Sequence, residues 1–387
     1  MDREVKATSK KITFMVPLLF FFSALLIVSN VYLLLPITAH VADYFGTSIE
    51  KAAWGSGAFS LCYAFGLLFF GALSDRFNKK KIIWFGMGAT AVITYLTGEA
   101  GNVYLFLLAR GIQGFFAASF APAANAYVFE VIPKQKQTMV LSLINIAFLL
   151  SGVFGQLVAS WITVRYGWTT VFIPLAVCYV ILFIAISFGI PSERATTQLR
   201  KSNSFKFVRK PIVLYCYGIT FSLLFSFVGM YGSVGDHLVA NFYLSPNGII
   251  LFRSIGIIGM AAALFTGTLL NRFGPYIVLT SSLIVAISGV IAMLFLYSFY
   301  LLAAASVIYV SGISVTIPSI VTLIGKHSPG ERGKALSIYA FILLSGASTA
   351  SVLAAMLSFQ TLILVIIAML SIAVILSCFV KNAAAAQ

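Results

Sequence analysis

Residues 71–81 read GALSDRFNKKK and place five charged side chains within eleven residues. Elsewhere charge is scarce, because only 9% of the chain is charged while 60% of it is hydrophobic. A related stretch, GTLLNRFGPY, starts at Gly267, and the two stretches begin 267 − 71 = 196 residues apart. Since this offset is close to half of the 387 residues, the two stretches indicate an internal duplication.

The composition excludes a soluble globular protein, because the mean hydropathy is +1.02 and aromatic residues make up 14% of the chain. A bilayer core requires about 20 apolar residues per helix, and about twelve such segments lie between polar breaks. The alternation typical of barrel strands is absent, so the sequence predicts an all-α integral membrane protein. The predicted spans are residues 12–38, 49–72, 82–98, 102–127, 138–163, 168–190, 211–235, 247–270, 276–296, 300–325, 334–357 and 359–380.

The longest polar break separates six predicted spans from six. It covers residues 191–211 and is basic, so we expect a linker between an N-terminal bundle, residues 1–190, and a C-terminal bundle, residues 212–387. A second landmark supports this division, because Pro133 and Pro329 stand in related segments at the same offset as the first pair.

The basic residues predict the orientation. With an even number of spans both termini lie on one side, and that side carries 21 of the 25 Lys and Arg residues, while the other side carries Lys51 and Arg165. Both termini are therefore expected in the cytoplasm of a multi-pass cell-membrane protein. This bias, together with attraction to anionic lipid headgroups, explains the net charge of +15 without nucleic-acid binding.

Motifs for catalysis and cofactors are absent from the sequence. The four cysteines lie within apolar spans without CxxC spacing, and there is no P-loop, nucleotide-binding glycine motif or pair of catalytic carboxylates. We therefore expect no enzyme, no cofactor and no metal. A channel is disfavoured because no filter-like loop or ring of pore charges is present, and a receptor or scaffold would normally carry a soluble domain. Two six-helix halves favour a secondary transporter that draws on a gradient.

The opening stretch resembles the loop between helices 2 and 3 of the major facilitator superfamily, which reads G-x-L-a-D-r-x-G-r-K. At the position of the second glycine this chain has Asn78, which we expect to adopt the left-handed backbone of a tight turn. The residues that match the family motif are Gly71, Leu73, Asp75, Arg76, Lys79 and Lys80.

A second resemblance lies in residues 109–119, ARGIQGFFAAS, which are similar to the family's helix 4 pattern R-x-x-q-G-x-g-a-a. Arg110, Gln113 and Gly114 stand at i, i+3 and i+4 and so share one helical face. Together the motifs are typical of the twelve-helix drug/proton antiporter branch, and they imply a monomer with two pseudo-symmetric six-helix bundles and alternating access. The branch's helix 5 motif G-P-x-x-G-G is degraded to GQLVAS at residues 155–160, which leaves uniport or uptake open.

The resemblance also implies a cytoplasmic gate. In the family the motif aspartate lies at the start of helix 11, where its charge suits the positive end of the helix dipole, and Glu130 is placed to pair with Arg76 or Lys79. The alternative is that the lysines only enforce topology. The C-terminal counterparts of Asp75 and Glu130 are Asn271 and Lys326. The predicted gate comprises Gly71, Asp75, Arg76, Lys79, Glu130 and Arg332.

The predicted membrane interior contains arginine but no carboxylate, because all ten acidic residues fall near the surfaces. Arg110 and Arg253 lie roughly 12 and 10 Å below the outer helix ends, in opposite halves. If both face a central cavity they flank it, and guanidinium groups suit carboxylates or phosphates. Alternatively, each arginine snorkels outward or bonds backbone carbonyls. The predicted substrate cavity comprises Asn30, Arg110, Gln113, Asn145, Tyr231, Arg253, Tyr309 and Tyr339.

Two pairs of titratable residues end helices 1 and 7 in related positions: His40 and Asp43, and Asp236 and His237. Because histidine changes charge near pH 6.5, they are candidates for a proton-sensitive outer gate, and the alternative is that they cap helices at the interface. The functional expectation is a secondary transporter that exports a small neutral or anionic metabolite or drug. Multidrug efflux of lipophilic cations is the alternative.

Overall fold

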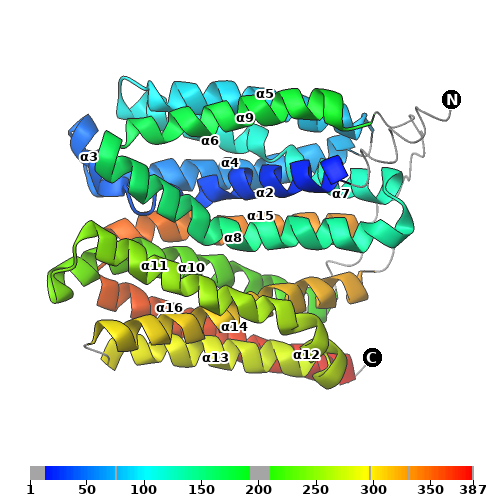
Figure 1. Cartoon of the computed structure of the whole chain (residues 1–387). Helices are drawn as coiled ribbons and strands as arrows, with labels where there is room; N and C mark the ends of the chain where they lie inside the picture. The colour runs from blue at the N-terminus through cyan, green and yellow to red at the C-terminus, as the bar shows by residue number, and fades with distance from the viewer. Residues whose placement is uncertain (1–13, 75, 192–209, 296–297, 329–331, 386–387) are drawn as a thin grey trace. The chain divides into compact units, whose positions relative to one another are not determined.

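The computed structural model describes residues 14–385, except 75, 192–209, 296–297 and 329–331 (Figure 1). These residues are almost entirely helical and contain no strand. The all-α prediction is therefore confirmed.

The chain divides into two compact units, Met1–Lys201 and Ser202–Gln387. Of the predicted linker, 191–211, the segment 192–209 lies outside the described residues. The first unit contains α2 (Val16–Tyr32), α3 (Thr38–Phe45), α4 (Ile49–Ser74), α5 (Lys79–Gly98), α6 (Val103–Ala117), α7 (Phe120–Val131), α8 (Lys134–Tyr166), η2 (Thr169–Val171) and α9 (Phe172–Gly189). The second contains α10 (Pro211–Phe242), α11 (Pro246–Met260), η4 (Ala261–Phe265), α12 (Thr266–Phe273), α13 (Pro275–Phe295), α14 (Phe299–His327), α15 (Arg332–Met356) and α16 (Phe359–Ala385).

Helix packing repeats between the units. In the first unit α2 packs on α8, α4 on α6 and α5 on α9; in the second α10 packs on α15, α11 on α14 and α13 on α16. In each unit, therefore, the first span packs on the fifth, the second on the fourth and the third on the sixth. This repeated packing is what the internal duplication indicated by the sequence predicts.

Among the described residues, nine helices are long and apolar enough to cross a membrane, and a tenth is added if α8, bent by 42°, counts as one span. The two remaining predicted spans coincide with α2 and α5. The twelve spans predicted from the sequence thus all find a helical counterpart.

Two predicted spans are broken by proline. The span predicted at 12–38 ends as α2 at Tyr32, and a turn containing Pro36 precedes α3. The span predicted at 102–127 breaks between α6 and α7, because Pro122 has no N–H to donate to the carbonyl of Ala118 four residues earlier. A third break, η4 between α11 and α12, is a 3₁₀ segment without proline.

Candidate functional site

The first unit holds Arg110 at the centre of a buried hydrogen-bond network. Its side chain is 0% exposed and donates four hydrogen bonds within the unit. Nε bonds the carbonyl of Gly55 at 3.2 Å, and Nη1 bonds Gln113 Oε1 at 2.6 Å. Asn30 accepts from Nη1 at its Oδ1, at 3.3 Å, and from Nη2 at its backbone oxygen, at 2.8 Å. The guanidinium therefore ties α6 to α2 and α4.

Further polar side chains extend this network to α5 and α9. Gln113 Nε2 donates to Asn30 Oδ1 at 3.2 Å and to Thr94 Oγ1 at 2.7 Å. Asn30 Nδ2 donates to the Tyr179 hydroxyl at 2.6 Å. All four side chains are fully buried, so their hydrogen bonds offset the cost of removing them from water.

The charge of Arg110 is stabilised by aromatic and dipolar groups. No described carboxylate pairs with it. The guanidinium carbon lies 4.4 Å from the centroid of the Phe59 ring, a cation–π geometry. The structure thus brings together three of the predicted cavity residues: Asn30, Arg110 and Gln113. It adds Thr94 and Tyr179, which the sequence signals only as isolated polar residues within apolar spans.

In the second unit Arg253 on α11 is 2% exposed but makes one hydrogen bond, from Nη2 to the backbone oxygen of Tyr231 at 3.2 Å. Its Nε and the buried hydroxyl of Tyr231 have no hydrogen-bond partner among the described residues. The structure therefore brings this predicted pair together but leaves both side chains with unused hydrogen-bonding capacity.

The other predicted cavity residues lie on separate helices. Tyr309 on α14 and Tyr339 on α15 are buried, whereas Asn145 on α8 is exposed. Whether any of the eight residues lines a substrate path stays a prediction.

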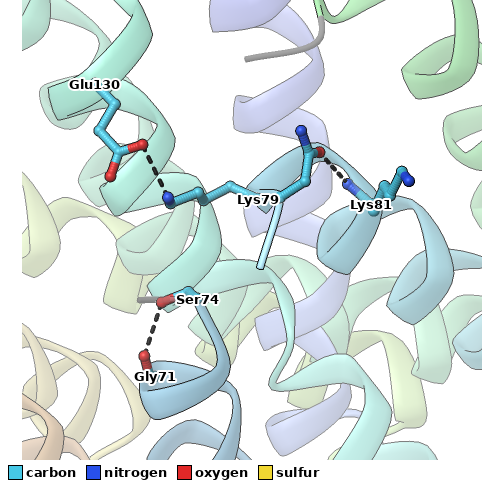
Figure 2. Close-up of polar contacts among 6 residues, drawn as sticks. Gly71, Ser74, Lys79, Lys81 and Glu130 are labelled. Atoms are coloured by element: carbon cyan, nitrogen blue, oxygen red, sulfur yellow. Dashed lines mark hydrogen bonds and ion pairs between the residues drawn. The ribbon is translucent and has the colours of Figure 1, made fainter. Parts of the chain in front are cut away.

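At the predicted gate, Lys79 and Glu130 form an ion pair of 2.9 Å between α5 and α7, as Figure 2 shows. Of the two partners that the sequence allows for Glu130, the structure has Lys79, while Arg76 is exposed. Lys79 is 7% exposed, so the pair is partly shielded from water.

The loop differs from the expected left-handed turn. Asn78 has extended backbone, with φ −61° and ψ 118°, and acts as the N-cap of α5 by accepting a hydrogen bond from the backbone N–H of Lys81 at 3.0 Å. The expectation of a left-handed residue was wrong, because an N-cap asparagine needs extended backbone to satisfy the first turn of the helix. Gly71 accepts a hydrogen bond from the Ser74 hydroxyl at 2.8 Å (Figure 2).

Two members of the predicted gate fall outside the description in whole or in part. Asp75 lies outside the described residues, and Arg332 begins α15, but its side chain lies outside the description. The contact that the family resemblance implies between Asp75 and the start of helix 11 stays a prediction.

The candidates for proton coupling lie at helix ends. His40 and Asp43 are exposed on α3, a short helix separate from α2, and Asp236 is exposed on α10. His237 is half-buried, and its ring stacks on Phe359 of α16 with centroids 4.2 Å apart.

Comparisons with known proteins agree with the helical repeat. The model of the Major Facilitator Superfamily matches residues 20–296. An uncharacterised transporter of Buchnera aphidicola subsp. Schizaphis graminum is 22% identical, with 89% of this chain and 84% of the relative covered. The multidrug resistance protein MdtG of Salmonella typhi is 21% identical, with 77% of each chain covered. A crystal structure of a bacterial homologue of the lysosomal transporter Spinster, inward-facing and unoccupied, has a TM-score of 0.77 at 16% identity, with 95% of this chain and 97% of the other covered.

Proposed function

Because the chain belongs to the Major Facilitator Superfamily, we propose that it is a secondary transporter that exports a small neutral or anionic organic molecule by alternating access. It is a multi-pass membrane protein of a transport family and not an enzyme. In this proposal both termini are cytoplasmic, the protein works as a monomer in the cell membrane, and protons supply the gradient.

The charge of the interior supports this substrate class. Three charged side chains are buried among the described residues, Lys79, Arg110 and Arg253, and all three are cations. Lys79 is paired with Glu130, but neither arginine forms an ion pair with a described carboxylate. Because two buried positive charges without an ion-pair partner repel a cation and attract an anion, they favour an anionic or neutral substrate.

Export is supported by the kind of relatives that the chain matches, such as MdtG, whose name denotes multidrug resistance. That name also favours a second candidate, broad efflux of lipophilic cations. In this proposal the rim residues Asp75 and Arg332 help to close the cytoplasmic face. The Lys79–Glu130 pair, which belongs to the same predicted gate, joins α5 to α7.

Three probes that share one phenyl ring test the proposal: benzenesulfonate, benzenesulfonamide and phenyltrimethylammonium, which are anionic, neutral and cationic. The purified protein is reconstituted in sealed vesicles, and the flux of each probe is measured with and without an imposed pH gradient. We expect saturable flux of the sulfonate that the gradient accelerates. Flux of the cation alone would contradict the substrate class, currents without substrate would indicate a channel, and no flux at all would indicate a scaffold.

A further inference from the structure

Two buried polar groups without a described partner belong to residues that are joined by a hydrogen bond, from Arg253 Nη2 to the backbone oxygen of Tyr231. The Nε of Arg253 and the hydroxyl of Tyr231 are both buried and have no hydrogen-bond partner among the described residues. More than nine in ten buried polar groups in folded proteins have such a partner. Two exceptions on hydrogen-bonded residues therefore point to a partner that binds from outside the chain.

The geometry directs both side chains into the contact between α10 and α11. A methyl group at Gly256 would overlap the Tyr231 hydroxyl, so the tyrosine side chain reaches α11 at that glycine. Gly256 follows Arg253 by three residues, which is about one helical turn, so the two positions lie on the same face. The phenol of Tyr231 therefore reaches α11 about one turn beyond Arg253, while the guanidinium of Arg253 reaches α10.

The guanidinium of Arg253 lies beside a glycine of α10. Its Nη2 lies 3.5 Å from where a methyl group at Gly235 would stand, so α10 presents bare backbone there. The next residue, Asp236, is exposed and forms no ion pair with Arg253 in the described structure. The charge of Arg253 therefore has no ion-pair partner among the described residues.

The helix that carries Arg253 is interrupted. The 3₁₀ segment η4 follows α11, and Thr266, the first residue of α12, also has a buried hydroxyl without a partner among the described residues. In membrane transporters interrupted helices supply polar groups to ligands near the middle of the bilayer. The break is thus a second feature of α11 that suits ligand contact.

We propose that Arg253, Tyr231 and Gly256 form a subsite in the C-terminal unit that binds the anionic group of a small organic substrate. The inference rests on the proposed transport function. Arg253 pairs with the carboxylate, sulfonate or phosphate group through Nε and the unused Nη hydrogens, and the Tyr231 hydroxyl donates a further hydrogen bond. Gly256 keeps the space into which that hydroxyl points.

Binding to purified protein in detergent tests the subsite, with benzenesulfonate and benzenesulfonamide as the probes. The variants are Arg253→Gln, Tyr231→Phe and Gly256→Ala. Their matched controls in the same unit are Arg272→Gln and Tyr300→Phe, which change exposed residues, and Gly267→Ala, where an added methyl group meets nothing within 4 Å. Thermal unfolding without probe shows whether each variant is folded.

Wild type is expected to bind the sulfonate about tenfold or more tightly than the sulfonamide, because hydrogen bonds to a charged group are the stronger ones. Arg253→Gln should remove this preference, Tyr231→Phe and Gly256→Ala should reduce it several-fold, and the controls should keep it. If Arg253→Gln does not fold, the other two variants decide. Equal binding of the two probes by wild type, or an unchanged preference in the folded variants, would overturn the subsite. Wild type that binds the sulfonate with this preference but moves no probe would contradict the transport function and leave the subsite standing.

Discussion

The two units share one helix-packing pattern but use their buried arginines differently. In the first unit Arg110 donates four hydrogen bonds and lies against an aromatic ring. In the second, Arg253 is nearly as buried but makes one hydrogen bond, and its Nε has no partner among the described residues. A buried charge with its donors satisfied stabilises the fold, whereas one with unused donors is available to a ligand.

The two units also differ at the rims that are predicted to be cytoplasmic. Glu130 pairs with Lys79 between the third and fourth spans of the first unit. At the corresponding position of the second unit stands Lys326, whose Nζ lies 5.8 Å from the centroid of the Tyr276 ring between α13 and α14. Duplication has therefore preserved the helices, while the polar contacts have diverged.

The largest effect is expected from Arg110→Leu. Loss of four hydrogen bonds that join α2, α4 and α6 should lower the free energy of unfolding by about 2–4 kcal/mol. Arg253→Leu should change it by less than about 1 kcal/mol, because that side chain has little bonding to lose. Thermal unfolding in detergent compares the stabilities of the two variants. An equal loss of stability in both would contradict the contrast between the two arginines.

The rim contrast predicts a one-sided gate. Asp75→Asn should lower transport about tenfold without reducing expression or stability, because it would remove the charged hydrogen bond to the start of helix 11 that the family resemblance implies. Its control is the C-terminal counterpart, Asn271→Asp, which should leave flux near the wild-type rate. Vesicle flux of benzenesulfonate is the measurement, and full activity of Asp75→Asn would remove the gate from this account.

The ion pair of the first rim should have a smaller effect. Glu130→Gln is expected to destabilise the protein by about 1 kcal/mol, and less at high salt, because the pair is only partly shielded. Lys326→Gln should cost about 0.5 kcal/mol, since a cation–π contact at an exposed site is weak. Thermal unfolding at low and high salt checks both, and a salt-independent loss in Glu130→Gln would show that packing and not charge is responsible.

The smallest effect is expected at the predicted outer end. His237→Phe keeps an aromatic ring stacked on Phe359 but removes the ionisable imidazole. The outer-gate hypothesis predicts that the flux of wild type changes by no more than about threefold between pH 5.5 and 7.5. This change should be absent in the variant. Identical pH profiles of variant and wild type would reject a proton-sensitive role for this histidine.

Much of the fold could be predicted from the sequence, because apolar runs and the repeated landmarks depend on residue order alone. Proline accounts for two of the breaks, because Pro36 and Pro122 have no N–H to donate to the carbonyl four residues earlier. It does not predict a break by itself, since α14 continues through Pro318. Asn78 was not assigned correctly, because asparagine suits both a left-handed turn and an extended N-cap, and only the position of the first helical turn decides between them.

The candidate site could be predicted only in part. The spacing of Arg110 and Gln113 shows that they share a face, but not that Asn30, 80 residues earlier in the chain, supplies their acceptor. Likewise the depth of Arg253 follows from residue counting, whereas its unused donors depend on where α10 places Tyr231. Whether a donor is satisfied is a property of tertiary packing, and this property separates the two arginines.

The most direct test of that separation observes the guanidinium groups themselves. With ¹⁵N-labelled arginine in lipid nanodiscs, the Nε–H signals of Arg110 and Arg253 are assigned with the variants Arg110→Lys and Arg253→Lys and then followed as benzenesulfonate is added. We predict that the Arg253 signal shifts and its exchange with water slows, while the Arg110 signal stays unchanged and protected throughout. A shift confined to Arg110, or no shift at either arginine, would contradict the account.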